Sequence, residues 1–126
     1  MAIPRSQHGW NVILIDDDAS LRRALARAIS LGGYPVAAFD SVEALVEHGI
    51  PARDTCLVLD VHLPGINGIA FKKALAREGR DIPTVFITAL AADEVREPLA
   101  TLAPVAVLHK PFNRNDLLDA IGRACR

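Results

Sequence analysis

The sequence predicts an α/β fold in which helices cover both faces of a parallel sheet. Short apolar runs alternate with longer segments whose apolar residues recur at helical spacing, in the order βαβαβαβαβα. The runs are rich in β-branched residues, which is typical of strands buried on both faces. Because no repeat, low-complexity segment or linker interrupts this order, we expect one domain over residues 11–126, after a flexible N-terminal arm over residues 1–10.

Five runs are predicted to form the strands. NVILI is the first of them, CLVLD is the clearest, and PVAAF is the weakest. We expect the strands at residues 11–15, 35–39, 56–60, 83–88 and 105–109.

Capping residues indicate where the helices begin. A side chain that can accept a hydrogen bond from the first helical turn stands before four of the helical segments. The candidate caps are, in chain order, Asp18 or Ser20, Ser41, Asn67 and Asn113. Glycine follows the first three of these segments, where it can end a helix.

Composition excludes several classes of partner. The chain has 126 residues, 51% of them hydrophobic, and a formal net charge of −1, so no basic excess indicates direct binding to nucleic acid. No apolar stretch approaches the roughly 20 residues that cross a bilayer, and the N-terminus lacks the apolar segment of a signal peptide. Cys56 and Cys125 form no disulfide framework. We therefore expect a soluble, reduced, cytoplasmic protein without a membrane partner.

Polar side chains collect where the predicted strands end. Asp16 and Asp17 follow the first strand, Asp60 ends the third, Thr88 ends the fourth, and Lys110 follows the fifth. The carboxyl ends of parallel strands meet at one edge of the sheet, where such folds bind ligands. Two like charges about 4 Å apart near a protein surface repel by roughly 4 kcal/mol, so three acids together predict a bound cation.

This set of side chains suits a metal ion that prefers oxygen ligands, together with a phosphoryl group. Mg²⁺ prefers oxygen ligands, and a carboxylate can act as a nucleophile toward phosphorus. An ammonium group and a hydroxyl would then bind the transferred oxygens. Plainer interpretations remain open for two residues, because Thr88 can be an ordinary strand residue and Lys110 an ordinary surface lysine. His62 and His109 do not indicate zinc, since no second ligand stands at suitable spacing from His109.

Four segments resemble the motifs of response-regulator receiver domains, the CheY-like phosphoacceptor modules of two-component signalling. They are ILIDDDASLRRAL, LVLDVHLPGINGIAF, VFITAL and LHKPF, and each lies at a predicted strand end. The resemblance runs from about residue 11 to the C-terminus. It implies a flavodoxin-like, doubly wound (βα)5 three-layer sandwich whose five parallel strands have the order 2-1-3-4-5.

The resemblance also implies a role for each site residue. Asp60 is the expected phosphorylation site, and Asp17 is the expected principal ligand of Mg²⁺, with Asp16 acting largely through a water. The backbone carbonyl of His62 and Asp60 itself complete the protein's share of the metal shell. Thr88 and Lys110 are expected to bind the phosphoryl oxygens, and the Lys110–Pro111 peptide is expected to be cis.

The sequence departs from the family pattern near its fourth helix and fifth strand. Receivers usually carry Tyr or Phe three residues before the lysine, where this chain has Val107, and the usual Gly-Ala before that strand is Ala103-Pro104. Pro98 lies inside the predicted fourth helix, where proline costs about 3 kcal/mol, so we expect this helix to be short, kinked or late-starting. We expect an atypical signalling route.

Three functions are compatible with these observations. The resemblance favours a receiver that takes phosphate from a sensor histidine kinase or a phosphotransfer protein and acts on a downstream effector or on a fused output domain outside this chain. Such a receiver is a monomer or weak dimer and no enzyme, apart from self-phosphorylation and slow autodephosphorylation. The alternative is a docking module that works without phosphorylation. An aspartyl phosphatase is disfavoured, because His62 stands where that class typically has a second acid.

Overall fold

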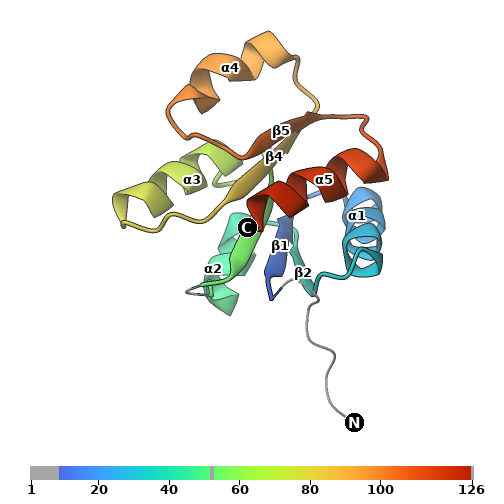
Figure 1. The fold of residues 1–126 in the computed structure, drawn as a ribbon. Helices are drawn as coiled ribbons and strands as arrows, with labels where there is room; N and C mark the ends of the chain where they lie inside the picture. The colour runs from blue at the N-terminus through green and yellow to red at the C-terminus, as the bar shows by residue number, and fades with distance from the viewer. Residues whose placement is uncertain (1–8, 52, 126) are drawn as a thin grey trace.

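Ten elements alternate along the chain, of which the computed structural model describes residues 9–51 and 53–125 (Figure 1). The strands are β1 (Asn11–Ile15), β2 (Val36–Phe39), β3 (Thr55–Asp60), β4 (Thr84–Thr88) and β5 (Ala106–His109). The helices are α1 (Ala19–Leu31), α2 (Val42–His48), α3 (Gly68–Arg77), α4 (Ala92–Ala100) and α5 (Arg114–Ala124). All strands pair in parallel in the order β2-β1-β3-β4-β5, which confirms the predicted flavodoxin-like sheet.

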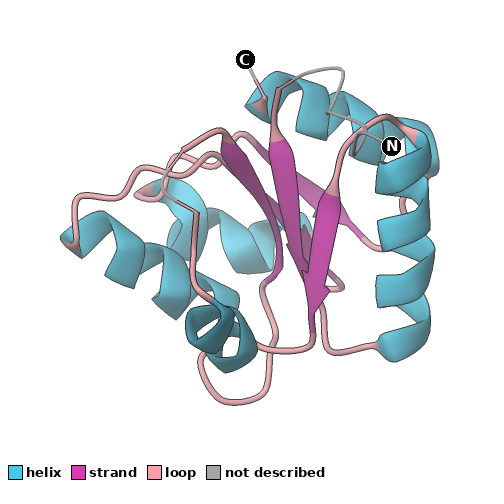
Figure 2. Ribbon diagram, turned by 90° about the horizontal axis from the view of Figure 1, so that it is seen from below, coloured by secondary structure: helices cyan, strands magenta, loops and turns pink. Residues whose placement is uncertain are grey.

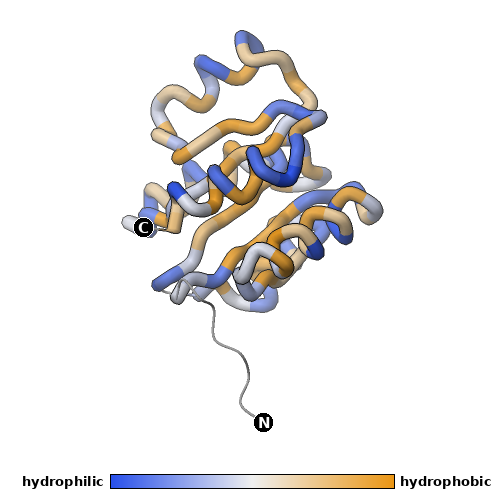
Figure 3. The backbone as a smooth tube through the Cα atoms, turned by 45° about the vertical axis from the view of Figure 1, so that its right-hand side comes forward, coloured by the Kyte–Doolittle hydropathy of each residue, from blue (hydrophilic) through white to orange (hydrophobic). Residues whose placement is uncertain are grey.

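Helices cover both faces of the sheet, so the domain is a three-layer sandwich (Figure 2). The helices α1 and α5 lie on one face, and α2, α3 and α4 lie on the other (Figure 1). Apolar residues follow the strands through the middle layer, as the orange segments of Figure 3 show. This arrangement is the one that right-handed crossover connections between parallel strands produce.

Each central strand contributes side chains to two separate cores. In β1, Ile13 and Ile15 point into the core beneath α2, α3 and α4, whereas Val12 and Leu14 point toward α1 and α5. None of these four side chains is more than 3% exposed. A strand that is buried on both faces needs apolar residues at every position, which explains the uninterrupted run in the sequence.

The predicted caps begin their helices. The side chains of Asp18, Ser41, Asn67 and Asn113 each accept a hydrogen bond from the backbone N–H three residues later, at 3.2, 3.1, 2.8 and 2.8 Å. The first helix is therefore capped by Asp18, and Ser20 lies within its first turn. These bonds satisfy donors that have no partner inside the helix.

Proline residues precede two of the strands, and a further proline lies inside one short helix. β2 and β4 begin one residue later than predicted, after Pro35 and Pro83, whose nitrogens cannot donate a ladder hydrogen bond. The nine-residue helix α4 begins directly after Ala91 and contains Pro98 near its C-terminal end. It is shorter than α1, α3 and α5, so the expectation of a short helix is met, whereas the late start is not.

The remaining expectations concern the N-terminus, the cysteines and the membrane. Residues 1–8 of the expected arm lie outside the described residues, while Trp10 is half-buried against the core beneath α1 and α5. Cys56 is buried in that same core, and its thiol contacts the thiol of Cys125 at the end of α5; both are free thiols. Among the described residues, none of the helices has the length and apolar character required to span a bilayer.

Candidate functional site

The carboxyl ends of four strands meet at one edge of the sheet and bring the predicted side chains together. Asp16 and Asp17 follow β1, Asp60 ends β3, Thr88 ends β4, and Lys110 follows β5. Neighbouring strands are paired in register up to these positions, so the ends of β3, β4 and β5 lie within one residue of each other along the sheet. The parallel topology therefore assembles residues that are up to 94 positions apart in the sequence (16 to 110).

Three carboxylates form the centre of this site. Asp16, Asp17 and Asp60 each offer an oxygen atom, and these atoms lie within 4.8 Å of one another. Asp16 and Asp60 are 0% and 3% exposed, whereas Asp17 lies open to solvent. Burial and the nearby charge of Asp60 raise the pKa of Asp16, although a hydrogen bond from the Asp18 N–H and the charge of Lys110 oppose that change.

Lys110 supplies the positive charge on the other side of the site. Its Nζ donates a hydrogen bond to Asp60 Oδ2 at 3.0 Å and lies 3.4 Å from Asp16 Oδ2. Burial alone would lower the pKa of Lys110, but the hydrogen bond and charge of Asp60, together with the charge of Asp16, outweigh burial and raise it. Lys110 is therefore protonated and positively charged at neutral pH. The Lys110–Pro111 peptide is cis, as the resemblance predicted.

The two buried carboxylates, Asp16 and Asp60, differ in the hydrogen bonds that their oxygens accept. Asp60 Oδ1 accepts a hydrogen bond from the His62 N–H at 3.0 Å, and Asp16 Oδ1 accepts one from the Asp18 N–H at 2.9 Å. Asp16 Oδ2 is fully buried and forms an ion pair with the Lys110 ammonium at 3.4 Å, but it accepts no hydrogen bond. A buried carboxylate oxygen that lacks a hydrogen bond, beside two further carboxylates, fits a hard cation such as Mg²⁺. The ligand role of the His62 carbonyl stays a prediction.

Thr88 lies at the same edge, but its hydroxyl has a local partner. The side chain is fully buried, and its Oγ1 accepts a hydrogen bond from the Leu90 N–H at 3.0 Å. Its backbone carbonyl accepts a hydrogen bond from the Lys110 N–H at 2.7 Å. The hydroxyl keeps its proton free to donate, because these bonds use only acceptor sites. The plain strand interpretation and the phosphoryl role are both compatible with this geometry.

Two residues that the sequence does not place in the site hold it in position. Gly68 begins α3 against the backbone of Asp60, so closely that a Cβ atom there would overlap the Asp60 carbonyl oxygen. The Arg22 Nη1 donates a hydrogen bond to the Asp16 carbonyl oxygen at 2.8 Å and so ties α1 to the end of β1. The sequence reveals the helix cap at Asn67, but it does not reveal which backbone the glycine after it contacts.

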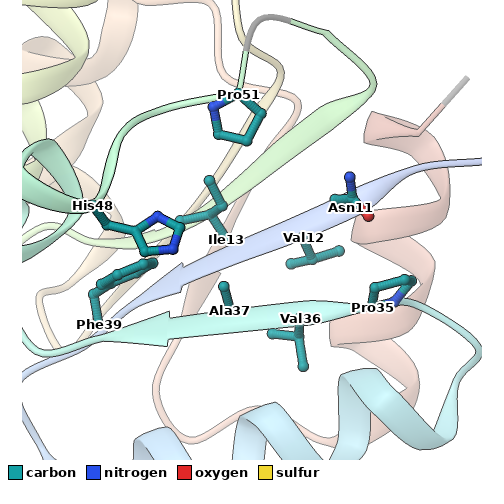
Figure 4. A pocket seen from close by; sticks show the side chains of 9 residues that line it. All are labelled: Asn11, Val12, Ile13, Pro35, Val36, Ala37, Phe39, His48 and Pro51. Carbon is teal, nitrogen blue, oxygen red and sulfur yellow. The ribbon is translucent and has the colours of Figure 1, made fainter. Parts of the chain in front are cut away.

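Val107 lines a hollow that opens widely to the surface between α4 and β5. The hollow has a volume of about 320 Å³, and its lining includes Ala92, Val95, Leu99, Pro104, Val107 and His109. A different hollow, of about 240 Å³, lies along β1 and β2, from Asn11 and Pro35 to Phe39 and His48, and its lining includes none of the acidic side chains of the site (Figure 4). The second hollow therefore does not belong to the candidate site.

Comparisons with known proteins agree with this geometry. The sequence pattern of the family described as the response regulator receiver domain matches residues 12–122. Nodulation protein W of Bradyrhizobium diazoefficiens is 36% identical over 110 residues, which cover 87% of this chain and 48% of that protein. Response regulator MprA of Mycobacterium ulcerans is 39% identical over 110 residues, which cover 85% of this chain and 46% of that protein. The chain thus spans about half the length of these relatives.

A solved structure has the same fold. The response regulator StyR superposes with a TM-score of 0.84 and 35% sequence identity, over 91% of this chain and 58% of that chain. The family pattern covers most of the present chain, and the sheet order, the acidic edge and the lysine after β5 all agree with it. The chain belongs to the response-regulator receiver domains of two-component signalling.

Proposed function

We propose that this receiver takes a phosphoryl group from a phospho-histidine onto Asp60 in a two-component phosphorelay, and that the modified domain acts as a signalling switch. The observation that carries the proposal is the position of Asp60. Its carboxylate is buried at the end of β3, is paired with Lys110, and lies next to two further carboxylates. That arrangement gives a nucleophile, a cation and oxygen ligands within one small site.

The transfer step follows from the contacts of Asp60. A carboxylate oxygen attacks phosphorus, the bond between phosphorus and the donor's imidazole nitrogen breaks, and the imidazole leaves with that electron pair and takes up a proton. The His62 N–H orients the carboxylate, and Lys110 neutralises the oxygens that arrive. The Thr88 hydroxyl donates a hydrogen bond to one of them. Asp16, Asp17, Asp60 and the His62 carbonyl would hold Mg²⁺, which supplies further neutralisation of the phosphoryl oxygens when bound.

Partners follow from the same proposal. A sensor histidine kinase or a phosphotransfer protein would supply the phosphoryl group in the cytoplasm. Because the chain spans about half the length of its relatives, its output would be a downstream effector protein or a fused output domain outside this chain. We propose that the domain itself is a monomer or weak dimer, and that its own chemistry is limited to self-phosphorylation and slow autodephosphorylation.

Intact-mass spectrometry tests the proposal. The protein is treated with acetyl phosphate with and without Mg²⁺, beside Asp60→Asn and the control Asp54→Asn, which changes an exposed carboxylate at the other end of the same strand. We expect the wild type and the control to gain one phosphoryl group in Mg²⁺ only, and Asp60→Asn to gain none. A folded wild type that gains none in either condition would favour the docking module that works without phosphorylation.

A further inference from the structure

The side chain of His109 is hydrogen-bonded to Leu90, which is itself hydrogen-bonded to Thr88 at the end of β4. Its Nδ1 lies 2.8 Å from the carbonyl oxygen of Leu90, and the N–H of Leu90 donates to Thr88 Oγ1 at 3.0 Å. A carbonyl only accepts, so Nδ1 carries the proton and donates it. Leu90 is therefore held on one side by a residue of the candidate site and on the other by His109.

The same residues are tied together through the sheet. Thr88 pairs with His109 in the register of β4 and β5, and the Lys110 N–H donates to the Thr88 carbonyl at 2.7 Å. These contacts fix the two strand ends relative to each other. Leu90, by contrast, lies outside the strands, so a change at Thr88 displaces Leu90 more easily than it displaces β5.

Leu90 and His109 both adjoin α4. The helix begins at Ala92, two residues after Leu90, and Leu90 packs against the core beneath this helix. His109 is half-buried and lines the open hollow of about 320 Å³ between α4 and β5, next to Val107. Because Val107 is small, the imidazole ring has room to move along this hollow once its bond to Leu90 is broken.

We propose that His109 is the positioning residue that links the state of Thr88 to α4, in place of the aromatic side chain that is missing at Val107. The inference rests on the proposed function, because a phosphoryl group on Asp60 is the trigger. When the Thr88 side chain rotates to bring its hydroxyl against that group, Oγ1 moves away from the Leu90 N–H. The Leu90 N–H then loses its acceptor and Leu90 shifts. The shift separates the Leu90 carbonyl from His109, and the first turn of α4 moves with it.

Thermodynamic linkage fixes the direction of the effect. The bond between His109 and Leu90 is made in the unmodified arrangement and broken in the modified one, so it opposes binding of a phosphoryl group. One hydrogen bond of ordinary net strength corresponds to roughly a fivefold change in an equilibrium constant. Removal of the bond therefore tightens the binding of a phosphoryl mimic by about fivefold, because coupling between two sites is reciprocal.

Beryllofluoride with Mg²⁺ is the probe. His109→Phe keeps a ring of similar size without a donor, His109→Asn retains an N–H donor close to the position of Nδ1, and Val107→Ala alters the neighbouring residue only. The measurements are the apparent dissociation constant of beryllofluoride and the backbone amide shifts of residues 89–96, followed by NMR. Circular dichroism checks that each variant is folded.

We expect His109→Phe to bind beryllofluoride about fivefold more tightly and to show a Leu90 amide shift displaced toward the bound position before any ligand is added. His109→Asn and Val107→Ala should match the wild type in both measurements. Wild-type affinity and shifts in His109→Phe would overturn the role of His109 while the phosphoacceptor proposal stands. Equal changes in His109→Phe and His109→Asn would also overturn it, because ring packing would then explain the effect. No binding to the wild type would overturn both.

Discussion

Gly68 lies where no other residue fits, because its backbone packs directly on the carbonyl of Asp60. The Gly68 N–H also donates to the Val61 carbonyl at 3.1 Å, which fixes the start of α3 beneath the end of β3. The position of the Asp60 carboxylate thus depends on a residue with no side chain. A methyl group would have to displace backbone atoms, which are less able to move than the end of a flexible side chain.

We predict that Gly68→Ala destabilises the domain by about 2–3 kcal/mol and lowers phosphoryl uptake at Asp60, because the added Cβ overlaps backbone atoms of that residue. Chemical denaturation and intact-mass spectrometry measure the two effects. Gly122→Ala in α5 is the control, because its Cβ would lie 3.9 Å from its nearest neighbour, Tyr34 Oη. Equal stability of the two variants would contradict the close packing at Gly68.

Lys72 is a buried cation outside the candidate site. It is 6% exposed, and its Nζ donates to the Ile82 carbonyl, which also accepts a hydrogen bond from Thr84 Oγ1 at 2.9 Å. Burial lowers the pKa of Lys72, although the nearby charge of Asp81 opposes that change. The unfolded chain therefore binds this proton more tightly than the folded one, and the ionised lysine reduces stability at neutral pH.

We predict that Lys72→Met raises the free energy of unfolding at pH 7 by about 1–2 kcal/mol, since the Ile82 carbonyl keeps its bond from Thr84. The wild type should gain stability as the pH rises through the folded pKa of Lys72 toward 10.5, whereas Lys72→Met should lack this gain. Urea denaturation at several pH values measures both. Lys73→Met, at an exposed neighbour, is the control, and an equal gain there would refute the explanation by burial.

Only those site residues that stand directly at the end of a strand could be predicted from the sequence. Asp16, Asp60, Thr88 and Lys110 stand at strand ends, and parallel topology brings strand ends together whatever the details of packing. The contacts of Gly68 and Lys72 depend on how α3 sits on the sheet, which local patterns do not determine. The sequence therefore gives no sign that Lys72 is almost completely buried.

The starts of four helices could be predicted for a related reason, whereas the strand order came from the family resemblance. A cap acts within three residues, so Ser41 and Asn67 reveal their helices locally. The helix α4 lacks such a cap: Ala91 has no side-chain oxygen, and Glu94 accepts a hydrogen bond from the Ala91 N–H at 3.3 Å instead. With Pro98 present as well, its extent is determined by the burial of its apolar side against the core rather than by local signals.

We predict that Pro98→Ala stabilises α4 by about 1–3 kcal/mol, because alanine restores an N–H donor inside the helix and relieves the clash of the proline ring. Hydrogen exchange of residues 92–100 should slow, since it reports local opening. The neighbouring exposed change Glu97→Ala is the control and should leave exchange almost unaltered. Faster exchange in Pro98→Ala would contradict the assignment of Pro98 as a weak point of α4.

The carboxylates clustered at the acidic edge lower the stability of the folded domain, and the proposed function requires them. Asp16 is buried with a raised pKa and one oxygen that accepts no hydrogen bond, and Asp60 and Asp17 add like charges. A sheet end without these acids would be more stable, but it would lack the oxygen ligands and the nucleophile that the proposed function requires. Natural proteins commonly retain such local costs where function requires them.

We predict that Mg²⁺ stabilises the domain, because it binds the folded acidic edge and has no such site in the unfolded chain. At 100 times its dissociation constant the gain is about 2.7 kcal/mol. Thermal unfolding with and without Mg²⁺ measures it, with EDTA to remove the metal. Asp17→Asn should lose most of the gain, while Asp119→Asn, at an exposed acid on α5, should keep it. Equal gains in both variants would place the metal elsewhere.

The proposed function requires that Asp60, and neither Asp16 nor Asp17, carries the phosphoryl group. Borohydride reduction of the acetyl-phosphate-treated protein converts an aspartyl phosphate to homoserine, and peptide mapping in a mass spectrometer then locates the modified residue. We expect homoserine at position 60 alone, and only when Mg²⁺ was present. Homoserine at position 16 or 17, or none in a folded protein that has gained a phosphoryl group, would contradict it.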